Sequence, residues 1–465
     1  MNHQKFPHAK LGIIVSVFFL LALGFTYWPA ALPTSSELAK SSESANRLAT
    51  GQPRLISSVP MSGSPSDLDA PMCEWTPVSA EAGEAFYQPG YQPIAMQAPS
   101  ADAARNSRDI NRRYIPGEDE RPPLRTIRDT YPTYSALAVD FNSNEVFLQD
   151  ENLFGIKVFD RNTNTPSNAA FSEPKRMIDG PETKLEFNCG LYVDPKTGDI
   201  YSVANDTVDT MVVFPRNAEG NVKPMRELRT PHGTFGIAVD EDAQELFLTV
   251  QHEHALVVFR KQAAGDEKEL RRIEGPLTGL EDPHGVALDT RNGVVYVSNH
   301  GNYNDRQKPG TGRFDKPSIT AYSIKDSGNI APLRIIEGPK TQMNWPASMA
   351  FDPATNELYV ANDVGDSVLV FGPEDKGDVA PRRVIKGPRA GIKNPTGVYL
   401  DPKNKEVWVA NMGNHTATAY AINANGNTAP LRTIRSAPAG KVALAIGNPG
   451  GVAYDSKRQE ILVPN

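Results

Sequence analysis

The sequence predicts an all-β fold, a seven-bladed β-propeller of four-stranded blades, over residues 106–465. Three observations predict it. Short runs rich in β-branched and aromatic residues alternate with turns rich in Gly, Pro, Asn and Asp. Four such runs make a unit that recurs at roughly 50-residue spacing, which is typical of a propeller blade. No run keeps the 3.6-residue period of an amphipathic helix, so a helical solenoid is excluded.

One copy of the unit shows all four runs clearly. They cover residues 332–339, 348–353, 357–362 and 367–371, with the alternation expected of half-buried strands. An aspartate ends the second run of every copy. These aspartates are Asp140, Asp194, Asp240, Asp289, Asp352, Asp401 and Asp455. Seven copies of a four-strand unit predict seven blades.

Composition narrows the range of functions. The chain carries 48 Lys and Arg against 55 Asp and Glu, a net charge of −7. Nucleic-acid-binding domains usually carry a basic surface, so we expect no nucleic-acid partner. Two cysteines, Cys73 and Cys189, are too few for a disulfide scaffold or a zinc site made of Cys alone. No Gly-x-Ser-x-Gly elbow, His-Glu-x-x-His helix or Walker loop is present, so no catalytic residue is assigned.

The N-terminus predicts a membrane tether. Residues 11–28 carry no charge and, as a helix, would span about 27 Å, close to the thickness of a bilayer core. Lys5 and Lys10 precede this stretch, so the positive-inside rule leaves the N-terminus in the cytoplasm and exports the rest. A cleaved signal peptide and an uncleaved signal anchor both fit. The length of the run and the poor cleavage site at 28–31 favour the anchor.

The sequence therefore predicts that the chain has three segments. Residues 1–31 are predicted as a cytoplasmic N-terminus with a signal-anchor helix. Residues 32–105 are rich in Ser, Pro and Ala and are predicted as a flexible tether. Residues 106–465 are predicted as the propeller, on the extracytoplasmic side, periplasmic or extracellular.

The units resemble NHL-type repeats and the related propeller repeats of bacterial exported proteins. The resemblance rests on residues such as 394–402, Asn-Pro-Thr-Gly-Val-Tyr-Leu-Asp-Pro, and 406–411, Glu-Val-Trp-Val-Ala-Asn. It implies that the Gly-Val-Ala-Asp-like strand (a) is innermost, followed outward by strands b, c and d. The last copy then has only strands a and b. We expect residues 111–127 to supply its c and d strands and to close the ring. The resemblance leaves function open, because such propellers include enzymes and binding platforms.

Residues that recur in every copy are predicted to be structural. An arginine recurs in each strand d, for example Arg176 and Arg334, and we assign it to packing and pairing between blades. The aspartates that end strand a are expected to cap the turn to strand b by side-chain hydrogen bonds. Trp345 and Trp408 are expected to be packing residues.

The histidines break the repeat. In antiparallel blades the d–a and b–c loops share one end, here called the histidine face, and all six histidines of the propeller region fall on it. Five belong to blades 3 and 4 and are the predicted metal ligands: His232, His252, His254, His284 and His300. In His252-Glu253-His254 the two histidines would share one side of an extended strand. The alternative is that polar loops simply tolerate histidine.

A long b–c loop in blade 4, residues 301–317, is a second irregularity on this face. Long loops on rigid scaffolds often carry function, although a tolerated insertion is an equal alternative. The candidates for ligand binding are His284, His300, Asn299, Cys189, Arg306 and Arg313.

Two classes of function remain. The leading interpretation is a membrane-tethered extracytoplasmic propeller that binds a protein or small-molecule ligand as a scaffold module. The alternative is a metal-dependent lyase or hydrolase with its site on the histidine face of blades 3 and 4, since neutral His is a common metal ligand. A divalent metal is the only cofactor that the sequence suggests.

Overall fold

The structure is a computed structural model. It describes residues 129–205, 207–303, 312–444, 453–455, 457 and 460–462. The predicted anchor (11–28), the predicted tether (32–105) and the predicted closing strands (111–127) lie outside the described residues. Within the described part of the chain, no helix is long and apolar enough to cross a membrane.

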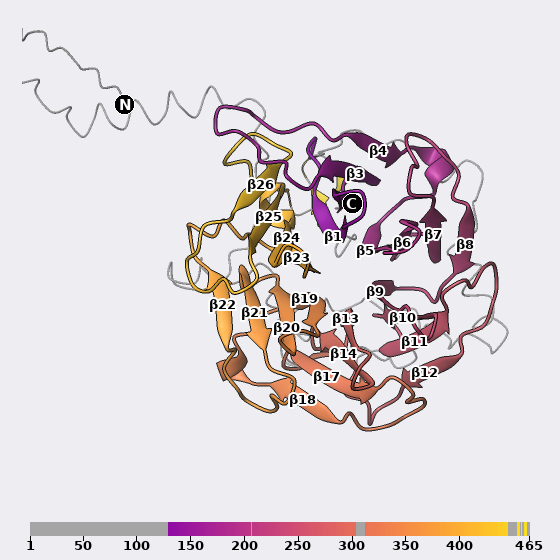
Figure 1. Ribbon diagram of the computed structural model, residues 1–465. Coiled ribbons are helices and arrows are strands. Elements are labelled where there is room, and N and C mark those ends of the chain that lie inside the picture. Colours follow the sequence, from indigo (N-terminus) through magenta and orange to yellow (C-terminus); the bar gives the residue numbers. More distant parts are fainter. Residues whose placement is uncertain are drawn as a thin grey trace, which may run out of the picture. The chain divides into compact units, whose positions relative to one another are not determined.

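The described residues form an all-β propeller of four-stranded antiparallel blades (Figure 1). Blade 1 comprises β1 (Tyr134–Asp140), β2 (Glu145–Asp150), β3 (Gly155–Asp160) and β4 (Arg176–Asp179). Blade 2 comprises β5 (Asn188–Val193), β6 (Ile200–Ala204), β7 (Thr210–Phe214) and β8 (Arg226–Arg229). Blade 3 comprises β9 (Thr234–Asp240), β10 (Glu245–Val250), β11 (Ala255–Arg260) and β12 (Arg271–Glu274).

The second half of the ring repeats this plan. Blade 4 comprises β13 (Pro283–Asp289), β14 (Val294–Asn299), β17 (Ser318–Ser323) and β18 (Arg334–Glu337). Blade 5 comprises β19 (Pro346–Asp352), β20 (Glu357–Asn362), β21 (Ser367–Phe371) and β22 (Arg383–Lys386). Blade 6 comprises β23 (Pro395–Asp401), β24 (Glu406–Asn411), β25 (Thr416–Ala421) and β26 (Arg432–Arg435).

A few short elements complete the described structure. A hairpin of β15 (Asn302–Tyr303) and β16 (Arg313–Phe314) extends the b–c connection of blade 4. β27 (Ala453–Asp455) pairs only with β28 (Glu460–Leu462). Three single-turn 3-10 helices lie in loops: η2 (Pro181–Thr183), η3 (Pro339–Thr341) and η4 (Met412–Asn414).

The ring closes between blade 6 and blade 1. Each hydrophobic cluster is shared by two neighbouring sheets, and one cluster joins Trp408 of blade 6 to Tyr134 of blade 1. The Thr396 hydroxyl donates a hydrogen bond to the Tyr134 carbonyl over 3.0 Å. A Cβ on Gly397 would lie 3.1 Å from the Ala136 Cα, so the two inner strands approach closely.

The described propeller therefore has six complete blades, where the sequence predicts seven. The seventh copy, marked by Asp455, is described only as the two-stranded β27–β28 pair. Sequence repeats specify strand pairing inside a blade. The number of blades in a ring depends instead on the packing angle between neighbouring sheets, which small residues at the inner strands, such as Gly397 and Ala136, adjust.

A clasp between blades was not predicted. The c–d loop of each of blades 2 to 6 forms a parallel bridge to strand d of the blade before it, for example Ile336 to Gly377. The bridging glycines all have φ between 59° and 83°, a left-handed conformation that glycine adopts without strain. In blade 1 the Thr165 N–H makes the equivalent contact by donating to the Thr433 carbonyl of blade 6. The clasps thus run round the whole ring.

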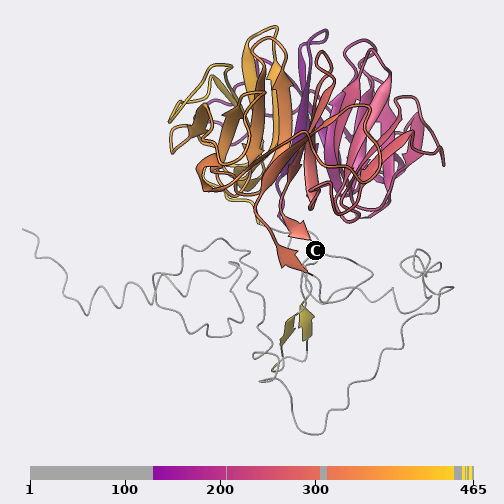
Figure 2. The ribbon, with the colours of Figure 1, turned by 90° about the horizontal axis from the view of Figure 1, so that it is seen from below.

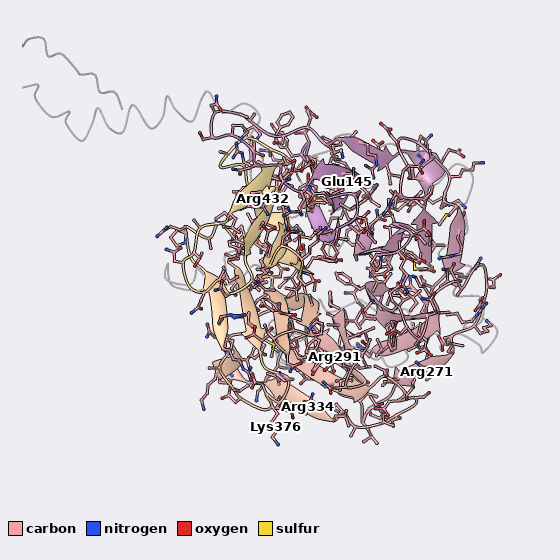
Figure 3. All side chains as sticks on the ribbon, viewed as in Figure 1. Glu145, Arg271, Arg291, Arg334, Lys376 and Arg432 are labelled. Carbon is pink, nitrogen blue, oxygen red and sulfur yellow. The ribbon has the colours of Figure 1, made fainter. Side chains whose placement is uncertain are left out.

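The predicted structural roles of the repeated residues are confirmed. The aspartates that end strand a accept N–H bonds from the following turn, as Asp194 does from Lys196 and Thr197. Most strand d arginines pair with a glutamate, cover an aromatic ring of strand b, or do both. Arg176 does both, against Glu145 and Phe147. Figure 3 shows Arg271, Arg334 and Arg432 in equivalent places around the ring.

Several of these arginines also reach the next blade. Arg176 donates to the carbonyl of Arg216, and Arg271 donates to the carbonyl of Ile324. Trp408 is fully buried under Arg432, as expected of a packing residue.

Candidate functional site

The histidine face gathers its histidines through strand register. In blade 4, Pro283 of the inner strand β13 pairs with Asn299 of β14. His300 directly follows β14 and donates its backbone N–H to the Asp282 carbonyl, and His284 lies in the irregular start of β13 between Pro283 and Val286. Their rings stack with centroids 3.4 Å apart and planes 18° apart. Both side chains are buried, with 5% and 3% of the residue exposed.

Asp282 joins these two histidines. One ligand atom from each of Asp282, His284 and His300 lies within 4.8 Å of the other two. The carboxylate oxygens of Asp282 lie 3.6 Å from His284 Nδ1 and 3.8 Å from His300 Nδ1. We call these three side chains the Asp282 group. Of the residues that the structure describes, no other set of His, Cys, Asp and Glu meets the same test.

Amides from two blades hold the Asp282 group in place. The Gln251 side-chain nitrogen, from blade 3, lies 2.7 Å from His284 Nε2 and 3.2 Å from an Asp282 oxygen. Asn302 donates to the other Asp282 oxygen over 2.8 Å. His284 Nδ1 lies 2.9 Å from the Asp282 carbonyl. In this network His284 Nδ1 is placed to donate to the Asp282 carbonyl and Nε2 to accept from Gln251.

His300 lacks such support. Its Nε2 is buried and has no hydrogen-bond partner among the described residues. Burial, reinforced by the neighbouring His284, holds the pKa of His300 well below its ordinary value of 6.5. The ring is therefore neutral at neutral pH. A buried polar atom without a partner costs about 1–3 kcal/mol, which makes it a candidate for a ligand contact.

Aromatic rings continue the stack on either side. Phe235 lies against His284 with centroids 4.2 Å apart, and Trp345 lies against His300 at 4.8 Å. Both flanking rings are partly exposed. Trp345 has a left-handed φ of 56°, which is strained for a bulky residue. The equivalent residues Asp282 and Asn394 also have a positive φ, so this conformation belongs to the repeat, and at Trp345 it holds the indole over His300.

The other predicted metal ligands lie apart from the group. His232 Nδ1 is 2.9 Å from Asp209, and its ring stacks on His252. His254 Nδ1 accepts the backbone N–H of Asp282, and Glu253 pairs with Arg272. The i, i+2 argument fails because residues 251–254 form a turn rather than an extended strand.

The predicted ligand-binding residues divide in the same way. His284 and His300 lie in the group. Asn299 is fully buried and bonds Glu281, Ser318 and Thr320, as Asn411 bonds the equivalent residues of blade 6, so it belongs to the scaffold. Cys189 is a buried residue of β5 in blade 2 and is not part of the Asp282 group. Arg306 lies outside the described residues.

Arg313 anchors the hairpin beside the Asp282 group. Its guanidinium lies 3.8 Å from the centroid of the Tyr303 ring, which stacks on His254. It also pairs with Glu281 and Asp315. These three charged residues line a groove of about 430 Å³. Burial and the Asp315 carboxylate raise the pKa of Glu281 to about 7.

The sequence did not single out Asp282 and Gln251, and Trp345, expected to be a packing residue, is partly exposed and lies over His300. A signal for Asp282 existed. It precedes a proline at the start of strand a, where the next two blades have Trp345-Pro346 and Asn394-Pro395. A comparison of this position across blades would have shown that only blade 4 among them places a carboxylate there.

A comparison with protein-family models also indicates a β-propeller. A family model described as "Lactonase, 7-bladed beta-propeller" matches residues 248–443, less than half of the chain but including the Asp282 group. No curated protein matches the sequence. A chain of the nidogen/laminin complex is similar at 15% identity, covering 66% of this chain and 92% of that chain, with a TM-score of 0.42. Kuenenia stuttgartiensis hydrazine synthase is similar at 12% identity, covering 75% and 98%, with a TM-score of 0.46.

Proposed function

We propose that the propeller is a hydrolase that opens cyclic esters, with the Asp282 group as its reaction centre. One observation carries the proposal. A buried, unpartnered His300 Nε2 lies beside a second imidazole and a carboxylate, within the segment that matches the lactonase model. Buried titratable groups without a structural task are typical of reaction centres.

Hydrolysis of a lactone requires little more than an activated water molecule. The oxygen of water adds to the lactone carbonyl carbon, the ring C–O bond breaks, and one proton of the water passes to the departing ring oxygen. The Asp282 group must therefore take a proton from water near neutral pH. Such proton transfer by a positioned group contributes about 10²–10⁴-fold to the rate. Phe235 and Trp345 flank the group and offer apolar faces to a ring-shaped substrate.

A panel of five- and six-membered lactones, assayed by acid release at constant pH, tests the proposal. We expect His300→Gln to lower kcat/KM by about 10²–10⁴-fold. His232→Gln is the matched control, because His232 lies on the same face but outside the Asp282 group. Failure of the unaltered protein to hydrolyse any lactone above the buffer rate would reject the proposal, and so would equal losses in the two variants.

A binding module is the second candidate, and the β15–β16 hairpin favours it. Figure 2 shows this hairpin projecting beyond the ends of the blades. Phe314 in it is 51% exposed, which suits contact with a partner protein. Replacing residues 303–314 with a Gly-Ser turn, which keeps Asn302 and its bond to Asp282, should leave lactone hydrolysis unchanged if the hairpin only binds a partner. A loss of hydrolysis would assign the hairpin to the reaction site.

We also propose that the propeller works outside the cytoplasm, tethered to the membrane through residues 11–28. The uncharged run and the preceding lysines support this location. The full-length protein should stay in the membrane fraction through a carbonate wash. Recovery of a soluble form that begins after Ala31 would show a cleaved signal peptide instead.

A further inference from the structure

We propose that the Asp282 group is a site for a first-row divalent transition-metal cation of the Zn²⁺ type, bound by one carboxylate and two imidazoles. The inference rests on the same three side chains as the proposed hydrolase and names the means by which they would activate water. It replaces the five-histidine set expected from the sequence.

The spacing of the donor atoms fits a cation. Two ligands at about 2.1 Å from a tetrahedral zinc ion lie roughly 3.4 Å from each other. The two carboxylate-to-imidazole distances of 3.6 and 3.8 Å exceed this value by only a few tenths of an ångström. The His284 and His300 rings stack almost in parallel, so their nitrogen lone pairs point in similar directions and do not converge on one metal ion. Binding therefore requires the two rings to turn, and each is carried by a separate strand end.

The charge around Asp282 also favours a cation. Some buried carboxylates of the propeller have a lysine partner, as Asp150 has Lys157 and Asp194 has Lys261, and others, such as Asp352, accept N–H bonds from the turn that follows them. Among the described residues, no lysine or arginine pairs with Asp282. The amides of Gln251 and Asn302 bond its oxygens, and the two imidazoles lie 3.6 and 3.8 Å away. A bound cation would compensate this negative charge in the way that the lysines do elsewhere.

The donor set selects the kind of metal. Imidazole nitrogens suit zinc, iron, cobalt and nickel, whereas calcium and magnesium prefer sites made only of oxygen ligands. Two histidines and one carboxylate leave an open coordination position, which is the arrangement of catalytic rather than structural zinc sites. A cation held in this way lowers the pKa of water to near 7.

The amide network has a defined place in such a site. Gln251 and Asn302 bond the oxygens of Asp282 and would orient the carboxylate toward the metal. Groups of this kind around metal ligands typically change affinity by 10–100-fold when they are replaced. The distances of 3.6 and 3.8 Å are to Nδ1 of each ring, so His284 would bind the metal through Nδ1 and carry its proton on Nε2, where the Gln251 amide would turn its oxygen toward the ring.

Metal binding by the full-length protein, made without a histidine tag and stripped with chelator, tests the inference. Titration with Zn²⁺ alone should show one equivalent per chain. His300→Gln and Asp282→Asn should weaken the affinity by about 100-fold or more. His232→Gln is the matched control and should bind as the unaltered protein does. Circular dichroism checks that each variant is folded.

The outcomes separate this inference from the proposed function. Absence of stoichiometric binding of Zn²⁺, Co²⁺ or Mn²⁺ by the unaltered protein overturns it, whatever the variants do. Equal weakening by His232→Gln also overturns it. Zinc binding without lactone hydrolysis supports the metal site and rejects the hydrolase. Lactone hydrolysis that persists in the metal-free protein supports the hydrolase and rejects the metal as the group that activates water.

Discussion

The junction of blades 6 and 1 and the junction of blades 3 and 4 each bury a histidine on the same face, in different surroundings. His415 Nδ1 lies 2.8 Å from the Pro132 carbonyl, and its Nε2 lies 3.4 Å from the Asp129 carboxylate. Its ring also meets Tyr131 edge-on. His415 therefore ties the start of blade 1 to blade 6. His300 Nε2 has no such contact among the described residues and faces a second imidazole instead.

The difference teaches that histidine on this face is not itself a sign of function. Both residues follow strand b of their blade, and both are almost fully buried. Neither Nε2 has a hydrogen-bond partner among the described residues, but His415 Nε2 lies 3.4 Å from a carboxylate and His415 Nδ1 lies 2.8 Å from the Pro132 carbonyl, whereas His300 has only a carboxylate 3.8 Å from Nδ1. The informative property is whether the fold supplies a partner for a buried polar atom, which depends on residues distant in sequence.

The largest loss of stability is expected at Glu145, a buried carboxylate that pairs with both Arg176 and Lys175. Burial alone would raise the pKa of Glu145, but hydrogen bonds from Arg176 and Lys175 lower it from 4.5 to about 2. This pair therefore stabilises the fold above pH 4.5, and its contribution is lost as the pH falls from 4.5 toward 2. Glu145→Gln should remove about 3 kcal/mol of the free energy of unfolding at pH 7 and very little near pH 2.

Urea denaturation at several pH values measures this loss. A stability difference between the unaltered protein and Glu145→Gln that stays constant from pH 7 to pH 3 would contradict the ion-pair account. It would assign the effect to packing.

The two histidines should respond differently to the same substitution. His415→Phe removes contacts with Pro132 and Asp129, so we expect it to lower the free energy of unfolding by about 2 kcal/mol. His300→Phe removes a nitrogen that has no described partner, so we expect a change within about 1 kcal/mol of zero. Paired urea titrations compare the two variants. A larger loss for His300→Phe would show that the fold, rather than a ligand, needs that nitrogen.

The smallest effect is expected at the C-terminus, and it tests the number of blades. If the ring closes between β23 and β1, deletion of residues 453–465 should change the free energy of unfolding by less than about 1 kcal/mol and Tm by only a few degrees. A loss of most of the stability would show that the β27–β28 pair belongs to a seventh blade.

The sequence was sufficient for the features that repeat. Strand order, the aspartate-capped turns and the arginine pairs follow from short-range patterns that occur in every copy. The shared face of the histidines also followed from antiparallel topology. The number of blades did not, because closure depends on contacts such as Thr396 with Tyr134, which are 262 residues apart.

The candidate site was predicted only in part for a related reason. His284 and His300 stood out as residues that break the repeat. Asp282 and Gln251 come together with them only because blade 3 packs on blade 4. Residue type alone was not sufficient. His232, His252 and His254 are chemically suitable metal ligands, but in this structure they contact other groups.

The clasps between blades have a consequence for how this chain meets other chains. Strand d is the outer edge of every blade, and an open edge of this kind invites a strand from another molecule. In five junctions a glycine of the following blade occupies that edge, and at the sixth Thr165 does so. Each blade thus covers the outer edge of the blade before it, in the same direction round the ring. Each therefore shields its predecessor from strand addition, which protects a repetitive, β-rich chain from aggregation at high concentration.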